Sequence, residues 1–263
     1  MKDIRKNKIF AEDGLTLIVA MDHGATMGPL PGMKDPGKII ASVVQGGADA
    51  IMTSYGIATR FGHLFKRVGL ILRLDGGTSG LGDRSTGYMQ AVYSVNDALR
   101  IGADGVVCMG FPGSRWEHHT LPYLSQIVAD AHQWGMPVLV EALPRGFEPK
   151  EDARTVENIK TATRIAAELG ADFIKTHYTG TVDSFREVID SALVPVVVLG
   201  GSKMATDRDV LETVAQAMQA GARGIAMGRN IWQHPFPEKI TRALRAIIHD
   251  GADVPTATEY LAS

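Results

Sequence analysis

A lysine within an apolar, strand-like run is the residue that points most clearly to chemistry. Lys175 directly follows the run Ala171-Asp172-Phe173-Ile174, so its side chain must either enter the protein interior or interrupt the strand. Burial disfavours the charged ammonium and favours the neutral amine, which can attack a carbonyl carbon and form a Schiff base. The alternative is structural, with the ammonium paired to a buried carboxylate such as Glu141. We expect the nucleophilic role.

Two glycine-containing segments carry cations and suit a bound anion. The first is Gly200-Gly201-Ser202-Lys203, and the second is Gly228-Arg229 at the start of a short helical segment. Glycine lets backbone N–H groups approach an anion closely, and a helix N-terminus adds partial positive charge. Glycines that only allow tight turns would explain one segment but not both with their cations. The sequence therefore predicts a phosphate site formed by Gly201, Ser202, Lys203, Gly228 and Arg229.

Three further side chains are candidates for proton transfer. Asp22 stands two residues after the small Ala20, so strand alternation directs both to the same face. It could bind a substrate hydroxyl, relay a proton or pair with Lys175. Glu141 is expected on the neighbouring strand, as a general acid or base or as the partner of Lys175. His177 stands two residues after Lys175, so strand alternation directs its side chain inward as well.

A repeated phrase predicts the elements that position these residues. A helical pattern ends at a glycine, Ala-Asp or a close variant follows, and an apolar run comes next. The glycines of the four copies are Gly47, Gly102, Gly170 and Gly221. Glycine suits the left-handed conformation that ends a helix, and a continuous apolar run is typical of a strand buried on both faces. The repetition indicates stacked βα units and a parallel sheet.

Eight strands follow from this pattern, and clear helical periodicity appears at Glu157–Leu169 and Asp209–Gln219. We predict an α/β fold, a (β/α)8 TIM barrel, with residues 1–263 as a single domain. A doubly wound open sheet would carry a glycine-rich dinucleotide loop after its first strand, where this chain has Asp22-His23-Gly24. The strands are expected at Leu17–Asp22, Ala50–Thr53, Leu70–Leu74, Gly105–Met109, Val138–Leu143, Phe173–His177, Val196–Leu199 and Gly224–Met227.

The segment after the third predicted strand and the composition of the chain give further expectations about function. Residues 75–92 form a glycine-rich, polar stretch that we expect to be a long loop, with Asp83, Arg84 and Tyr88 near the site. The net charge of −2 predicts no binding to nucleic acid, and no apolar run is long enough to span a membrane. The charged first residues predict no signal peptide, so we expect a cytoplasmic protein. One cysteine cannot form an internal disulfide, and no residue set has metal-ligand spacing.

Four motifs, in matching order over nearly the whole chain, resemble those of the archaeal-type class I fructose-bisphosphate aldolases. They are Met21-Asp22-His23-Gly24, the segment 174–180 around Lys175, Gly200-Gly201-Ser202-Lys203, and the segment 227–233. The resemblance implies a Schiff-base (β/α)8 enzyme with a phosphorylated substrate, no metal or cofactor, and a large homo-oligomer such as a decamer. It makes Lys175 the Schiff-base lysine and Asp22 the catalytic aspartate of the first strand. Ser202, Lys203, Gly228 and Arg229 match the phosphate-binding positions.

One residue departs from the family pattern. Aldolases and heptulosonate synthases of this family have a proton-transfer tyrosine before Pro-Arg-Gly, and this chain has Leu143 there. Glu141 or His177 must then move the proton, or the reaction differs. The expected function is a class I aldolase acting on a phosphorylated ketose. The alternatives are another Schiff-base reaction, by a heptulosonate synthase or a thiolase acting on a phosphorylated diketone, and a non-catalytic barrel that binds a phosphorylated ligand.

Overall fold

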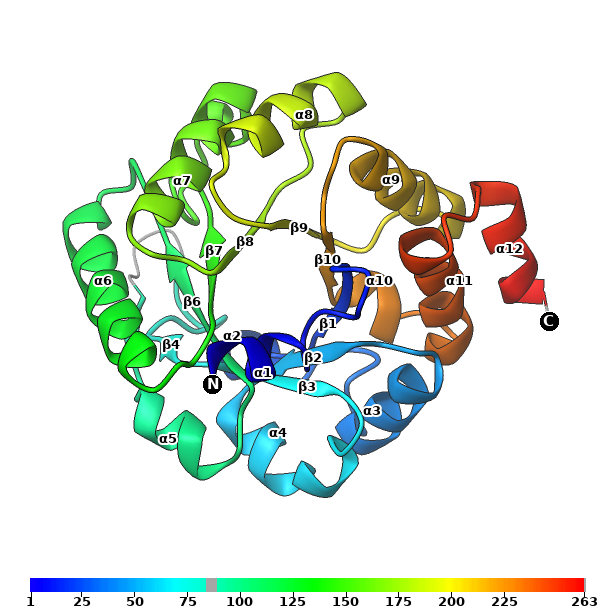
Figure 1. Ribbon diagram of the computed structural model, residues 1–263, viewed down its shortest axis with the longest axis horizontal. Coiled ribbons are helices and arrows are strands. Elements are labelled where there is room, and N and C mark those ends of the chain that lie inside the picture. The colour runs from blue at the N-terminus through cyan, green and yellow to red at the C-terminus, as the bar shows by residue number, and fades with distance from the viewer. Residues whose placement is uncertain (84–88, 263) are drawn as a thin grey trace.

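Eight parallel strands close into a barrel in the computed structural model, which describes residues 1–83 and 89–262 (Figure 1). Neighbours around the barrel follow the order β1-β10-β9-β8-β7-β6-β3-β2, and the predicted (β/α)8 TIM barrel is confirmed. The assignment of 1–263 to one domain stays a prediction. The barrel strands are β1 (Thr16–Ala20), β2 (Ala50–Thr53), β3 (Gly69–Arg73), β6 (Gly105–Gly110), β7 (Val138–Ala142), β8 (Phe173–Thr176), β9 (Val196–Leu199) and β10 (Gly224–Met227).

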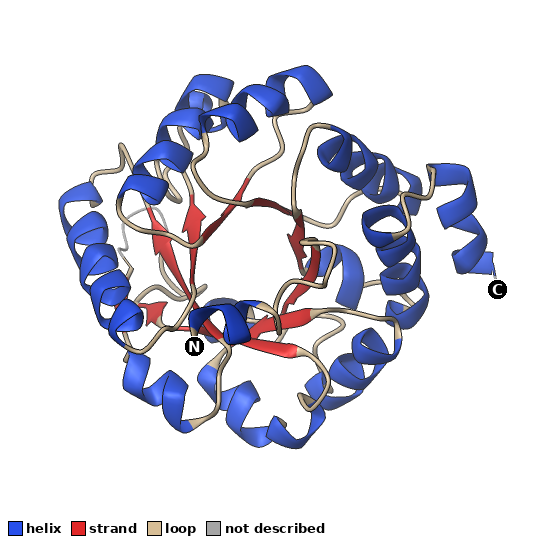
Figure 2. Ribbon diagram, in the orientation of Figure 1, coloured by secondary structure: helices blue, strands red, loops and turns tan. Residues whose placement is uncertain are grey.

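Amphipathic helices cover the outside of the barrel (Figure 2). Several of these helices begin at a side-chain cap. The hydroxyls of Thr155 and Thr206, for example, accept hydrogen bonds from the backbone N–H groups of Asn158 and Asp209. The helices are α1 (Lys2–Lys6), α2 (Gly24–Met27), α3 (Pro36–Gln45), α4 (Tyr55–Arg60), α5 (Val95–Arg100), α6 (Glu117–Gln133), α7 (Val156–Glu168), α8 (Val182–Ser191), α9 (Asp207–Gln219), α10 (Arg229–Trp232), α11 (Pro237–His249) and α12 (Val254–Ala262), with 3-10 turns η1 (Gly62–Leu64) and η2 (Glu151–Arg154). Within the described residues, no helix is long and apolar enough to cross a membrane.

The aspartate of the repeated phrase has a structural function. Asp49, Asp104 and Asp172 each precede a strand, and a carboxylate oxygen of each accepts a hydrogen bond from a backbone N–H of the neighbouring strand region, at 2.7, 3.0 and 3.0 Å. The helix-ending glycines have positive φ, for example 95° at Gly170 and 104° at Gly221. The phrase therefore combines a helix stop with a clamp that fixes where the next strand starts.

The N-terminal end of the barrel interior is filled by apolar side chains. Ile9, Phe173 and inward residues of the other strands form one buried cluster, and Phe10 packs against it. The rings of Phe10 and Phe173 meet edge to face with centroids 5.2 Å apart. Lys2 and Lys6 of α1 hold this segment in place through ion pairs to Asp172, at 2.7 and 3.1 Å. This end of the barrel is closed.

The stretch predicted as a long loop after the third strand contains regular structure. β4 (Asp75–Gly76) and β5 (Gln90–Ala91) form a short antiparallel pair, so the loop prediction is wrong at its two ends. A pair of two-residue strands is too short to produce a period in the sequence. Arg84 and Tyr88, which we expected near the site, lie outside the described residues.

Candidate active site

A cavity of about 960 Å³ opens at the carboxyl ends of the strands. Parallel strands in a barrel deliver their last inward side chains to this one place. Eight of the predicted site residues line the cavity, namely Asp22, Glu141, Lys175, His177, Gly201, Ser202, Gly228 and Arg229. The ninth, Lys203, is not among the described lining residues, and its Nζ donates to the carbonyl of Gln233 at 2.7 Å.

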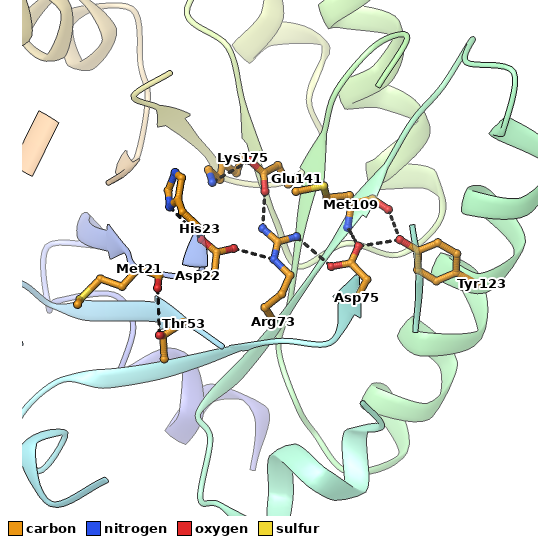
Figure 3. A network of polar contacts seen from close by, with 10 residues as sticks. All are labelled: Met21, Asp22, His23, Thr53, Arg73, Asp75, Met109, Tyr123, Glu141 and Lys175. Carbon is orange, nitrogen blue, oxygen red and sulfur yellow. Dashed lines mark hydrogen bonds and ion pairs between the residues drawn. The ribbon is translucent and has the colours of Figure 1, made fainter. Parts of the chain in front are cut away.

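Lys175 points into the barrel and is only 5% exposed. Its Nζ lies 2.8 Å from Oε1 of Glu141, which occupies the matching position on the neighbouring strand β7. The ion pair that the sequence analysis gave as the structural alternative for Lys175 is therefore present at the cavity floor (Figure 3). Because one carboxylate oxygen touches the amine, Glu141 is also positioned to accept its proton.

Arg73 is the central residue that the sequence analysis missed. Its guanidinium contacts three carboxylates, with Nε 2.7 Å from Asp22, Nη1 3.0 Å from Asp75 and Nη2 2.5 Å from Glu141 (Figure 3). Arginine suits this position because its planar fork presents donors in several directions and always carries charge. A signal was available: Arg73 interrupts the apolar run of β3 just as Lys175 interrupts that of β8.

The ion pairs decide the charge state of the carboxylates. Burial raises the pKa of Asp22 and of Glu141, but Arg73 and Lys175 outweigh it and hold both pKa values below their ordinary range. Conversely, burial lowers the pKa of Arg73, and the three surrounding carboxylates raise it well above its usual value. Asp22, Glu141 and Arg73 are therefore ionised at neutral pH, and both oxygens of Glu141 have cationic partners.

Asp75 links this cluster to a helix on the outside of the barrel. Its Oδ2 accepts a hydrogen bond from the backbone N–H of Met109 at 2.6 Å, and it lies 2.8 Å from the hydroxyl of Tyr123 on α6. The same hydroxyl is 2.7 Å from the carbonyl oxygen of Met109. Both oxygens of Asp75 are thus occupied, so this residue orients Arg73 and is not free to bind a substrate.

Two histidines line the cavity as neutral bases. Burial lowers the pKa of His177 to about 4, and the nearby Arg154 adds to the effect. Burial also lowers the pKa of His23, and this effect outweighs the negative charge of Asp22, which raises the pKa. Oδ1 of Asp22 lies 3.5 Å from Nδ1 of His23. A neutral imidazole can accept a proton at physiological pH. His177 follows Lys175 by two residues on the same face, as predicted.

The two glycine segments meet at one side of the cavity. Asn230 joins them, because its Nδ2 donates to the carbonyl of Gly200 at 2.9 Å and its Oδ1 accepts from Met204 N–H at 2.7 Å. Gly201 has φ of 61°, a conformation that favours glycine. Arg229 Nε is buried and, within the described part of the chain, has no hydrogen-bond partner. A buried donor without a partner is costly, so the site is suited to an incoming anion.

Leu143 also lines the cavity, two residues beyond Glu141. It is 7% exposed and packs with Met89 and Phe111. The position that the family pattern gives to a tyrosine is therefore apolar in this chain, and its surroundings are apolar too.

The protein is a closed parallel barrel with a buried lysine that contacts a carboxylate, and one side of its cavity is suited to an anion. These features are typical of a barrel enzyme of the Schiff-base class. The comparisons agree: the model of the DeoC/LacD family aldolases matches residues 16–234, and the chain belongs to this family. The prediction of a class I aldolase fold and family is confirmed.

Individual relatives carry different names. The 2-amino-3,7-dideoxy-D-threo-hept-6-ulosonate synthase of Halobacterium salinarum is 40% identical over 256 residues, which is 97% of this chain and 94% of the relative. The class 1 fructose-bisphosphate aldolase of Thermoproteus tenax is 36% identical over 250 residues, 93% of each chain. An archaeal fructose-1,6-bisphosphate aldolase, solved with its catalytic lysine bound to the carbinolamine intermediate, superposes with a TM-score of 0.86 at 34% identity, covering 94% of this chain and 99% of that one.

Proposed function

We propose that the protein is a class I, metal-independent aldolase that breaks or forms a carbon–carbon bond in a phosphorylated ketose or keto compound, with Lys175 as the Schiff-base residue. The observation that carries the proposal is the buried amine of Lys175, 2.8 Å from a carboxylate oxygen and beside a cavity large enough for a sugar phosphate.

Glu141 is proposed to accept the proton of Lys175, because it is the group in direct contact with Nζ. The neutral amine then attacks the ketone carbon, and loss of water from the carbinolamine leaves an iminium cation. This cation accepts the electron pair of the adjacent carbon–carbon bond when that bond breaks, which gives an enamine and releases an aldehyde. Protonation and hydrolysis of the enamine return the amine and the second product.

His177 is proposed to take the proton of the substrate hydroxyl during bond cleavage. Its imidazole is neutral above about pH 4, and it lines the cavity directly beyond Lys175. Asp22 is held ionised by Arg73 and is proposed to orient a substrate hydroxyl. With this division of roles the reaction does not need a tyrosine at position 143.

The phosphate of the substrate is proposed to bind beside Gly201, Ser202, Gly228 and Arg229. The buried Nε of Arg229, which has no hydrogen-bond partner among the described residues, supports this, as do the glycine segments at the carboxyl ends of β9 and β10. Remote binding energy from the phosphate would orient the carbonyl against the amine. Lys203 would have to leave the Gln233 carbonyl to take part.

The test is intact mass after borohydride reduction in the presence of dihydroxyacetone phosphate. We expect an adduct on the wild type and on Lys38→Ala, an exposed lysine on α3, and none on Lys175→Ala. Absence of an adduct with this ketone and with a panel of phosphorylated ketoses would reject the aldolase and favour a barrel that only binds phosphorylated ligands.

A different reaction on the same lysine is the second candidate, and Leu143 favours it because the family's proton-transfer tyrosine is missing. Acyl transfer to coenzyme A would convert a phosphorylated diketone only when coenzyme A is added, whereas aldol cleavage would proceed without it. We further propose that the protein is a homo-oligomer, as the family resemblance implies, and its native mass would test this.

A further inference from the structure

The cavity has two chemically different sides. The glycine segments and Arg229 lie at the ends of β9 and β10, which pair with each other and with β1. On the side of β6 and β7, an apolar part of the lining lies next to the charged residues Glu148, Lys150, Glu151 and Arg154. We call this apolar surface the apolar wall, and it is formed by Met89, Met109, Leu143 and Phe147. Figure 3 shows Met109 beyond Glu141 on the side away from His23.

The apolar wall is fixed by packing behind it. Phe111 is 2% exposed and meets the ring of Phe147 edge to face, with centroids 5.1 Å apart. Leu143 N–H donates to the carbonyl of Gly110 at 3.0 Å, which ties the end of β7 to β6. Leu143 and Met89 both pack on Phe111. A substrate must therefore fit against this surface as it stands.

The polar groups nearest the wall have little capacity left for a ligand. Both oxygens of Asp75 are occupied by Arg73, Met109 N–H and Tyr123. Both oxygens of Glu141 are occupied by Arg73 and Lys175. A hydroxyl placed against the apolar side chains of the wall, away from Asp22 and His177, would lose its water without gaining a partner from those side chains, and this is unfavourable.

We propose that the apolar wall selects a substrate whose carbons beyond the reacting carbonyl bear an alkyl or aryl group instead of a run of hydroxyls. This inference rests on the proposed function, because it assigns the aldehyde half of the reaction at Lys175. The phosphate binds at the β9–β10 side, the ketone carbon reaches Lys175, and the aldehyde portion lies against the wall. The exposed Lys150 and Arg154 line the outer rim, so the apolar portion is short.

The kinetic test holds the donor constant as dihydroxyacetone phosphate and compares propanal with glyceraldehyde, which share a three-carbon skeleton. We expect kcat/KM for propanal to exceed that for glyceraldehyde about tenfold or more, as expected for a site that leaves hydroxyls unpaired. Leu143→Gln should lower this ratio by about tenfold, because the amide offers the hydroxyls a partner. Leu193→Gln, at a leucine that is 59% exposed, should not change it. A wild-type ratio below one overturns the proposal.

A binding test separates this inference from the Schiff-base chemistry. Calorimetry on Lys175→Arg, which cannot form an imine, compares hexyl phosphate with sorbitol 6-phosphate. Tighter binding of hexyl phosphate, with the preference reduced in Lys175→Arg/Leu143→Gln, supports the apolar wall even if no adduct forms on the wild type. Equal or tighter binding of sorbitol 6-phosphate overturns it even if Lys175 proves to be the nucleophile.

Discussion

The two ends of the barrel interior are built on the same strands and have opposite character. Along β8, the inward residue at the closed end is Phe173, the next is Lys175 and the one after is His177, which lines the cavity. Along β7 the change is from Leu139 to Glu141. Each strand passes from an apolar to an ionisable side chain within two residues, which is a distance of about 7 Å.

This difference separates stability from chemistry along the barrel axis. The apolar end provides hydrophobic burial and closes the barrel. The charged end contains five ionisable side chains that contact one another, namely Asp22, Arg73, Asp75, Glu141 and Lys175. Buried charges contribute little net stability and depend on their partners. The charged end is therefore maintained for reactivity, and the following predictions test that division.

The largest effect should come from a change that keeps the charge and removes the nucleophile. Lys175→Arg retains the cation next to Glu141, but a guanidinium stays protonated and cannot form an imine. We expect complete loss of aldol activity and of borohydride trapping, with the free energy of unfolding changed by no more than about 1 kcal/mol. Retention of more than trace activity would mean that Lys175 is not the nucleophile.

Removal of the central cation Arg73 should lower both the stability and the activity of the protein. Arg73→Met leaves Asp22, Asp75 and Glu141 without their common partner, so we expect a loss of about 3–5 kcal/mol in urea unfolding together with loss of activity. Arg73→Lys is the control, because it keeps the charge and should lose less. Equal stability of Arg73→Met and wild type would show that the cluster does not depend on this residue.

A cavity at the closed end should affect stability alone. Phe173→Ala removes a fully buried ring from the apolar floor and should cost about 3–5 kcal/mol. The kcat of the folded protein should stay at the wild-type value, because the ring lies below the charged layer. Unfolding measured in urea and kcat measured well below the midpoint check this, and a large drop in kcat would contradict the division.

The pH dependence should expose the buried neutral histidine. The pKa of His177 is lowered to about 4 in the folded protein, against about 6.5 in an unfolded chain. Between these values the unfolded chain binds a proton that the folded protein does not, so stability falls as the pH decreases from 6.5 to 4. His177→Asn should flatten this part of the stability profile, and an unchanged slope would contradict the burial of a neutral ring.

The smallest effect is expected where the charged end meets the outer helix. Tyr123→Phe removes a hydroxyl that contacts Asp75 and the Met109 carbonyl, while Asp75 keeps Arg73 and the Met109 N–H. We expect a loss of about 1.5 kcal/mol and a modest fall in kcat. A drop in kcat as large as that of Arg73→Met would mean that Tyr123 takes part in proton transfer.

The sequence predicted the strands well because each has a local signal at both ends. The helix-stopping glycines and the apolar runs gave three strands with the bounds found in the structure, Ala50–Thr53, Val196–Leu199 and Gly224–Met227, and the other five within two residues at either end. The inward direction of Asp22 followed from Ala20 by alternation alone. Side chains two residues apart on one strand point to the same face, whatever surrounds the strand.

Relations between distant elements were not predictable in the same way. Tyr123 reaches Asp75 from a helix 48 positions away, and no local pattern records that contact. The direction of Lys203 depends on where the Gln233 carbonyl lies in space. Arg73 is different, because the argument applied to Lys175 applies equally to it and would have identified it.

The closed floor also constrains the order of events. Since Ile9 and Phe10 fill the N-terminal end, whatever reaches Lys175 enters and leaves through the same opening. In cleavage, the aldehyde is the part not covalently attached and must depart first, while the phosphorylated part stays on the lysine until hydrolysis. Release is therefore sequential, and the second product should inhibit competitively with the ketose, whereas the aldehyde should inhibit noncompetitively.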